Sequence, residues 1–356
     1  MVLLLAGFLK GAAERRTIRF IFCSDVHYGL NREFRGHEDV SASEVSRAML
    51  RSFKELERTA LPDDGGVESG DVFGKPDFVI CSGDIANRME NGVQTATESW
   101  KSFERDWSVL QCPLYLLPGN HDISNAIGYP KPLHPAIDAT SATEIYNRSV
   151  KSLQEKRTNA TFRYSRDKVH YSFVLDSIRF VLMGMWPDVA MRAWFDGEVR
   201  GDSLTPTLIF THDPPEADAK HFTNPNGRHD INRIDKFQNL LCDTASVKAA
   251  DRKPEGNWKV LEQFIKHRPF IKAYFHGDKN YNEFYTWRGV CGTIALPVFR
   301  VDSPMKGEYS ADNESRLSYI VVTIDPSKRI LTARECLWNT DATPALKWGD
   351  MRTIRY

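Results

Sequence analysis

Three short clusters of carboxylate, imidazole and amide side chains have the composition of a metal site. They are Asp25-Val26-His27, Gly83-Asp84 and Gly119-Asn120-His121-Asp122. Oxygen and nitrogen donors of these types bind divalent transition metals. Each cluster directly follows a short apolar run, so the elements formed by those runs decide where the donors lie. We expect the three clusters to form one shared site.

The three apolar runs are predicted to be buried strands, over Ile18–Cys23, Phe78–Cys81 and Leu114–Leu117. They are short and rich in β-branched and aromatic residues. Amphipathic helices are expected between them, over Ser43–Arg58 and Thr95–Leu110. Strands that alternate with helices predict a parallel sheet. In such a sheet ligands bind at the carboxyl ends of the strands, which is where the clusters can meet.

The second half of the chain predicts a second sheet. A hairpin is expected where Asp176-Ser177 separates two apolar runs. The predicted strands cover residues 169–175, 178–183, 207–210, 273–275, 294–298, 317–324 and 330–336, and a helix is expected over 258–267. Two of these strands lead into further histidines, in Thr211-His212-Asp213 and in His276-Gly277-Asp278-Lys279-Asn280.

The order D-x-H, G-D, G-N-H-D, a later histidine and a final histidine-containing cluster resembles that of the calcineurin-like metallophosphoesterases. The resemblance covers roughly residues 17–300. Each motif alone is weak, whereas the set in this order is specific. The resemblance implies an α/β fold, a four-layer α/β/β/α sandwich of two mixed sheets flanked by helices. It also implies a binuclear metal site at the carboxyl ends of the strands and hydrolysis of phosphoesters.

The same resemblance implies a ligand set. Asp25 and His27 would hold one metal, Asn120 and His212 the other, and Asp84 would bridge the two. Two ions about 3.5 to 4 Å apart clamp the attacking and leaving oxygens of a displacement at phosphorus. They also lower the pKa of a shared water, so that a bridging hydroxide is the expected nucleophile.

Two residues of the third cluster are expected to act in catalysis. His121 would be the general acid for the leaving oxygen, because imidazole titrates near neutral pH. Asp122 would orient the His121 ring, since a carboxylate fixes the tautomer of the imidazole that it contacts.

The last motif departs from the Gly-His-x-His that the family usually carries, and it allows two registers. Aligning Gly277 with the glycine puts Asp278 and Asn280 at the two histidine positions. Aligning His276 with the first histidine keeps that ligand of the second metal and puts Asp278 at the first metal. We prefer the second register. The expected cofactor is two divalent ions, Mn, Fe or Zn, which suit mixed His, Asp and amide ligands, with Mg or Ni also compatible. A carboxylate in place of an imidazole shifts the preference toward Mn, Mg or Fe(II).

Other side chains near the motifs have two interpretations. Tyr28 and Trp186 could line the space for a leaving group, although core packing is the plainer interpretation for aromatic residues. Four basic residues could contact phosphate or lie on a solvated loop surface, namely Arg32, His221, Arg228 and His229.

The composition limits the partners. The 356 residues contain 41% apolar and 26% charged residues, which is typical of a globular protein. Lys plus Arg and Asp plus Glu both number 47, so no net field attracts the chain to nucleic acid or an anionic membrane. We expect a small-molecule phosphoester as substrate and no nucleic acid partner; the oligomeric state is left open. The six cysteines show no C-x-x-C spacing.

The chain is expected to hold one main domain. Residues 1–16 are a signal-like or disordered segment, 17–340 the metallophosphoesterase domain with a loop or cap insertion at 213–255, and 341–356 a C-terminal tail. The apolar stretch at the start is far shorter than the about 20 residues of a membrane span, so none is expected. Export, to the periplasm or outside the cell, and a cytoplasmic location both stay open. A metal-poor binding module is the alternative to an enzyme, because the last motif is altered.

Overall fold

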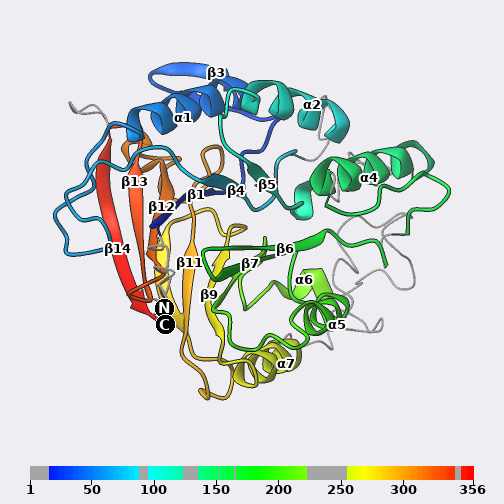
Figure 1. Ribbon diagram of the computed structural model, residues 1–356. Coiled ribbons are helices and arrows are strands. Elements are labelled where there is room, and N and C mark those ends of the chain that lie inside the picture. The colour runs from blue at the N-terminus through cyan, green and yellow to red at the C-terminus, as the bar shows by residue number, and fades with distance from the viewer. Residues whose placement is uncertain are drawn as a thin grey trace, which may run out of the picture.

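Two six-stranded sheets lie face to face between two layers of helices (Figure 1). The structure is a computed structural model that describes residues 16–87, 95–122, 135–151, 153–163, 166–222, 255–340 and 346–356, without the side chains of 135–142 and 219–220. The predicted four-layer α/β/β/α sandwich is confirmed. Of the predicted insertion at 213–255, residues 223–254, with Arg228 and His229, lie outside the described residues.

The first sheet has the strand order β14-β13-β12-β1-β4-β5. Its strands are β1 Ile18–Cys23, β4 Phe78–Cys81, β5 Leu114–Leu116, β12 Ser318–Asp325, β13 Ile330–Leu337 and β14 Lys347–Arg355. Neighbours β1, β4 and β5 are parallel, whereas β12, β13 and β14 pair antiparallel. The carboxyl ends of β1, β4 and β5 therefore lie at one edge of the sheet, as the sequence predicts.

The C-terminal residues differ from the prediction of a tail over 341–356. Lys347–Arg355 forms β14, the edge strand that pairs with β13. Most of its residues are exposed or half-buried, and Ile354 is the buried one. An edge strand without a buried face carries no apolar alternation, which is why the sequence pattern did not indicate it.

The second sheet has the strand order β10-β11-β9-β8-β7-β6. Its strands are β6 His170–Leu175, β7 Ile178–Met183, β8 Thr207–Phe210, β9 Ile271–His276, β10 Glu283–Trp287 and β11 Leu296–Arg300. The predicted hairpin is confirmed: β6 pairs antiparallel with β7, and φ is positive at both turn residues, Asp176 and Ser177. Strands β7, β8, β9 and β11 run parallel, so their carboxyl ends also share an edge.

Helices cover the outer faces of both sheets. α1 Ala42–Leu56 and α2 Ala96–Trp107 begin with capping boxes, in which the caps Ser41 and Thr95 accept from backbone N–H groups of their first turns. The two helices lie over the first sheet, and α5 and α7 lie over the second (Figure 1). The remaining elements are α4 Pro135–Val150, α5 Val189–Glu198, α6 Ala219–Phe222, α7 Glu255–Lys266, η2 Glu314–Arg316 and the hairpin of β2 Asn31–Phe34 and β3 His37–Ser41.

Stacked and edge-on phenylalanine rings fill the space between the two sheets. Phe20 and Phe22 of β1 point into this layer, and their ring centroids lie 5.9 and 5.4 Å from those of Phe210 and Phe275 respectively. Phe210 and Phe275 stack at 4.8 Å. Because these rings join β1 to β8 and β9, they hold the carboxyl ends of strands from both sheets side by side.

Two further features of the described residues are the length of the helices and the state of the cysteines. Within the described ranges, every helix is too short or too polar to cross a membrane. The cysteines that the structure describes, at positions 23, 81, 112, 291 and 336, are free thiols.

Candidate metal centre

The loops that follow β1, β4, β5, β8 and β9 meet at one edge of the two sheets. The N–H groups of Asp25 and His27 donate to the carbonyls of Gly83 and Asp84, both at 2.9 Å. The N–H of Gly277 donates to the carbonyl of His212 at 3.0 Å. Backbone hydrogen bonds therefore fix these loops relative to one another before any side chain is considered.

Four of the predicted metal-binding residues have left-handed backbone conformations. The φ angles of Asp25, His27, Asp84 and Asp278 are 58°, 41°, 48° and 64°. Non-glycine residues rarely adopt such angles, and residues held in them concentrate at functional sites. The surrounding loops thus hold these side chains in directions that ordinary strand or turn geometry would not give them.

Glycines let two of the loops pack without intervening side chains. A Cβ on Gly119 would lie 2.2 Å from Oδ1 of Asp84, and one on Gly83 would lie 2.6 Å from the nitrogen of Gly119. These contacts are far closer than a real Cβ tolerates. The glycines of G-D and G-N-H-D are therefore needed for the close approach of the loops around Asp84.

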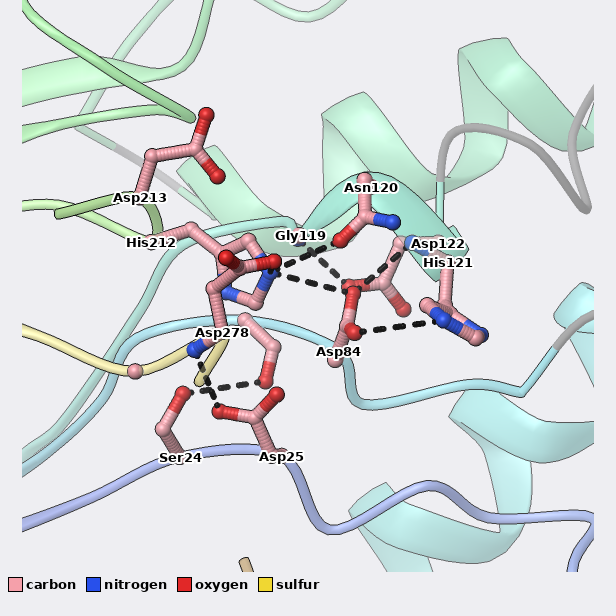
Figure 2. A network of polar contacts seen from close by, with 12 residues as sticks. Ser24, Asp25, Asp84, Gly119, Asn120, His121, Asp122, His212, Asp213 and Asp278 are labelled. Carbon is pink, nitrogen blue, oxygen red and sulfur yellow. Dashed lines mark hydrogen bonds and ion pairs between the residues drawn. The ribbon is translucent and has the colours of Figure 1, made fainter. Parts of the chain in front are cut away.

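Donor atoms of buried and half-buried residues form overlapping groups, and Figure 2 shows most of these residues. In each group the donor atoms lie within 4.8 Å of one another, and the groups are His27, Asp84 and His121, then Asp25, Asp84 and His212, and then His212, Asp213 and Asp278. Nε2 of His27 is 3.7 Å from carboxylate oxygens of both Asp25 and Asp84. Asp84 thus belongs to two groups, at the position expected of a bridging ligand.

His212 and Asn120 face the same space. Nδ1 of His212 lies 3.1 Å from the carbonyl of Ser82, and because a carbonyl only accepts, Nδ1 carries the proton. Nε2 lies 3.0 Å from Oδ1 of Asn120 and 3.4 Å from Oδ1 of Asp84, and in the neutral ring it is the nitrogen whose lone pair could bind a metal. A histidine held in this tautomer by a backbone carbonyl is oriented as metal-binding histidines are.

The electrostatics of the site favour a bound cation. Burial raises the pKa of Asp25 and raises that of Asp84 well above its usual value; the charge of Asp278 adds to the shift of Asp25, and the charge of Asp25 adds to that of Asp84. Burial lowers the pKa of His212, but Asp84, Asp25 and Asp278 together raise it to about 10. Oδ1 of Asp25 is buried and accepts no hydrogen bond from any described residue. These residues therefore fit a divalent metal, which would neutralise the carboxylates and coordinate the open oxygen.

The His121 ring contacts residues other than those that the sequence predicts. Nδ1 lies 3.0 Å from Oδ1 of Asn87 and 3.4 Å from Nζ of Lys306, and Nε2 lies 3.8 Å from Oδ2 of Asp84. Lys306 also donates to Oδ1 of Asn87 at 2.9 Å. Asn87 is the first polar residue after G-D, and Lys306 belongs to a loop that is distant in the sequence.

Asp122 does not contact the His121 ring, so the prediction that it orients this ring is wrong. Its carboxylate accepts from the N–H groups of Ile85, Ala86 and Gly119 at 3.2, 2.7 and 2.8 Å, and from Nε1 of Trp100 at 2.9 Å. Burial raises the pKa of Asp122 to about 6, although these hydrogen bonds oppose the shift. The residue instead joins the loop of Asp84 to that of Asn120.

In the last motif, Gly277 packs directly against the loop of Asp25. A Cβ on Gly277 would lie 2.2 Å from Oγ of Ser24 and 2.3 Å from Oδ2 of Asp25. The N–H of Asp278 donates to Oδ2 of Asp25 at 3.1 Å, and Oδ1 of Asp278 is 3.8 Å from Nε2 of His212. Asp278 therefore contacts the Asp25 carboxylate through its backbone N–H, and its side chain lies beside Nε2 of His212.

His276 is not brought into these groups, which differs from the preferred register. It is the last residue of β9 and lies on the same face of the strand as Tyr274, away from the interior that Phe275 fills. Nδ1 contacts the carbonyl of Gly277 at 2.8 Å, and Nε2 faces the hydroxyl of Tyr285 at 3.4 Å. Burial and the charge of Arg300 lower the pKa of this ring well below its usual value.

The aromatic and basic candidates from the sequence have structural contacts. Tyr28 and Trp186 are buried in the two outer core layers, the first packing on Phe103. Arg32 donates to backbone carbonyls of the loop after β11, and Nδ1 of His221 lies 2.9 Å from Oδ2 of Asp213.

Comparisons with known proteins give a family match and similar solved structures. A model of the family described as calcineurin-like phosphoesterase matches residues 18–302. Curated proteins give no significant match. A dimetal phosphatase from Danio rerio superposes with a TM-score of 0.52 at 12% identity, over 95% of this chain and 99% of that one. Vacuolar protein sorting 29 from Cryptosporidium parvum gives 0.37 at 11% identity, over 96% and 99% of the two chains.

The Danio rerio structure shares the fold of this chain. The family match is independent of that likeness and extends from β1 to the end of the second sheet, so it includes every strand-end cluster described above. The chain belongs to the calcineurin-like phosphoesterase family, whose members are metal-dependent hydrolases of phosphoesters.

Proposed function

We propose that this protein hydrolyses a small-molecule phosphoester with two divalent metal ions as cofactor. The observation that carries the proposal is the position of Asp84, a buried carboxylate shared by one donor group with His27 and another with His212. A carboxylate with donors on both sides is what a bridged pair of ions requires. The family match supports the reaction class.

The proposed ligands follow from the distances. Asp25, His27 and Asp84 are assigned to one ion. The other ion is assigned to Asp84, Asn120, His212 and Asp278. Side-chain oxygens of the other three residues lie 3.0 to 3.8 Å from Nε2 of His212. Bound in this way, the ions supply Lewis acidity, which makes water nucleophilic near neutral pH and offsets charge on the phosphoryl oxygens.

Lys279 supports the assignment of Asp278 as a ligand through one oxygen. Nζ of Lys279 lies 3.3 Å from Oδ2 of Asp278 and 2.8 Å from Oδ1 of Asp218. Oδ1 of Asp278 is the oxygen on the His212 side. A partner that holds one oxygen of a ligating carboxylate orients the other, as is common around metal sites.

His121 is proposed to handle the proton of the leaving oxygen. Nδ1 is held by Oδ1 of Asn87, which can only accept, so this nitrogen carries a proton in the neutral ring. Nε2 faces the Asp84 side of the site at 3.8 Å. When the ring is protonated, Nε2 carries the second proton and can pass it to a leaving group held beside the two ligand groups.

The ligand set favours particular metals. Three carboxylates, Asp25, Asp84 and Asp278, contribute to the assigned sites beside two imidazoles. Oxygen-rich sites suit Mn, Mg and Fe(II), whereas a larger share of imidazole suits Zn and Ni. We propose Mn or Fe(II) as the native ion, with Zn, Mg and Ni as the comparisons.

The test combines metal counting with turnover. Metal-stripped protein receives Mn, Fe, Zn, Ni or Mg, and hydrolysis of bis-nitrophenyl and mono-nitrophenyl phosphate is measured together with bound metal. Activity that rises with metal to a stoichiometry near two supports the proposal. Asp84→Asn should lose metal and activity. Asp325→Asn should keep both, because Asp325 is the last residue of β12 and lies near the start of β1, away from the donor groups at the end of β1. No turnover with any of these ions would contradict the proposal.

A binding module is the second candidate, and one observation favours it. His276 faces Tyr285 instead of the donor groups, so the altered motif contributes a carboxylate where the family has an imidazole. If this change weakens metal binding, purified protein should contain less than one ion per chain and hydrolyse neither substrate. The same metal titration therefore separates the two candidates.

A further inference from the structure

The loop after β11, residues 301–310, reaches the metal centre from a strand end that contributes no proposed ligand. Oγ of Ser303 donates to the carbonyl of Asp25 at 2.8 Å and accepts from the N–H groups of Met305 and Lys306 at 3.2 and 2.9 Å. One hydroxyl thus ties the loop to the Asp25 loop and sets the backbone direction at Lys306.

Two further contacts fix this loop. The guanidinium of Arg32 donates to the carbonyls of Pro304 and Ser310, both at 2.8 Å. The N–H of Glu308 donates to the carbonyl of Asn280 at 2.6 Å. The loop is therefore held on both sides of Lys306, so the position of its ammonium group is built into the fold.

The Lys306 side chain lies next to the proposed proton-handling residue. Its Nζ is 2.9 Å from Oδ1 of Asn87 and 3.4 Å from Nδ1 of His121, and the side chain is half-buried. Nε2 of the same ring faces Asp84, so the ammonium group lies on the His121 side of the proposed metal ligands.

The two lysines near the centre lie on different sides of it. Lys279 bridges the carboxylates of Asp218 and Asp278, beside His212. Lys306 lies beside His121, where a leaving oxygen would be placed. Charge on the His212 side thus orients a proposed ligand, whereas charge on the His121 side adjoins the substrate.

We propose that Lys306 is a substrate-binding residue whose ammonium group donates to an oxygen of the phosphoryl group. The inference rests on the proposed function. An ammonium ion attracts a phosphate monoester, with two negative charges, more than a diester, with one. Lys306 should therefore favour monoesters and retain inorganic phosphate.

The test measures binding without turnover. Inorganic phosphate is titrated calorimetrically into Mn-loaded protein, for the parent, Lys306→Met, Lys306→Arg and the control Lys328→Met. Lys328 lies in the turn after β12, at the opposite end of the sheet. Loss of a hydrogen bond to a charged group predicts phosphate binding about 10- to 100-fold weaker in Lys306→Met. Lys306→Arg should recover part of the affinity, and Lys328→Met should match the parent.

Turnover of the two nitrophenyl substrates supplies the second readout. Lys306→Met should raise KM more for the monoester than for the diester, with metal content unchanged. Unchanged phosphate affinity and KM with a lower kcat would overturn the inference, since Lys306 would then act only through Asn87 and His121. Loss of metal in Lys306→Met, or no phosphate binding by the parent, would also overturn it. If the parent binds phosphate but hydrolyses neither substrate, the proposed function is refuted. The role of Lys306 in phosphate binding is then decided by the calorimetric titration alone.

Discussion

Oδ1 of Asp278 lies 3.8 Å from Nε2 of His212, although the two residues follow different strands and are 66 positions apart in the sequence (278 − 212 = 66). β8 and β9 are parallel neighbours, so their carboxyl ends bring the two side chains together. With Asp278 as a proposed ligand, the proposed metal site is more anionic than one with two histidines in the last motif.

The first prediction compares Asp278→Ala with His276→Ala. Asp278→Ala should bind about one ion fewer or bind it at least about 10-fold more weakly, because truncation removes a proposed ligand. His276→Ala should keep its metal, because this ring faces Tyr285. Metal content after dialysis against a weak chelator measures both. The reverse result, with metal lost only in His276→Ala, would restore the other register.

Gly277 offers an independent test of the same register. In Gly277→Ala the new Cβ would need the space of Oγ of Ser24 and Oδ2 of Asp25. The Asp25 side chain must then shift, so metal affinity should fall while the thermal unfolding temperature of the metal-free protein changes little. Gly197→Ala, in α5, is the control for adding a methyl group to a glycine, because its Cβ would meet nothing within 4 Å and its backbone conformation suits an L residue. Equal metal affinity in Gly277→Ala and the parent would contradict the close packing.

The sequence was sufficient for the parts of the site that depend on strand ends. Asp25, Asp84 and His212 follow buried strands, and parallel strands bring their ends together whatever the distance in sequence. The register of the last motif was not predictable in this way. β9 extends one residue further than its apolar run, which makes His276 a strand residue and Gly277 the first residue of the loop.

The other differences share a physical cause. Asp122 was assigned to its chain neighbour His121, but a carboxylate inside a helical turn turns to the N–H groups of the facing loop instead. Lys306 comes from a loop that no motif marks, and only the packing of Ser303 on Asp25 brings it to the site. Contacts made by such loops depend on tertiary packing, which the apolar pattern of the sequence does not encode.

His121 and Asn87 give the third prediction. His121→Asn should lower kcat by about 10² to 10⁴-fold with metal retained, because it removes the proton-handling nitrogen. Asn87→Ala should cost about 10- to 100-fold, because the ring loses the acceptor that fixes its tautomer. Single-turnover rates at saturating Mn measure both. If His121→Asn instead loses metal, the ring is a ligand and not a proton donor.

The last prediction concerns stability against pH. Asp302, at the start of the loop that holds Lys306, is 4% exposed, and burial raises its pKa to about 8, with Glu335 adding to the shift. The unfolded chain loses this proton near pH 4, whereas the folded chain keeps it up to about pH 8. The folded state therefore binds more protons in this window, so this group makes the protein less stable as the pH rises from about 4 to 8.

The Asp302 contribution can be separated from that of the other buried carboxyl groups by difference. Each raised pKa of this size contributes up to about 1.4 kcal/mol per pH unit to the fall in stability. Asp302→Asn removes one such group, so its free energy of unfolding should fall less than that of the parent between pH 5 and 8. Denaturant unfolding of metal-free protein at several pH values measures the difference. Parallel curves for the two proteins would mean that Asp302 is ionised in the fold, and that the loop of Lys306 holds a buried charge.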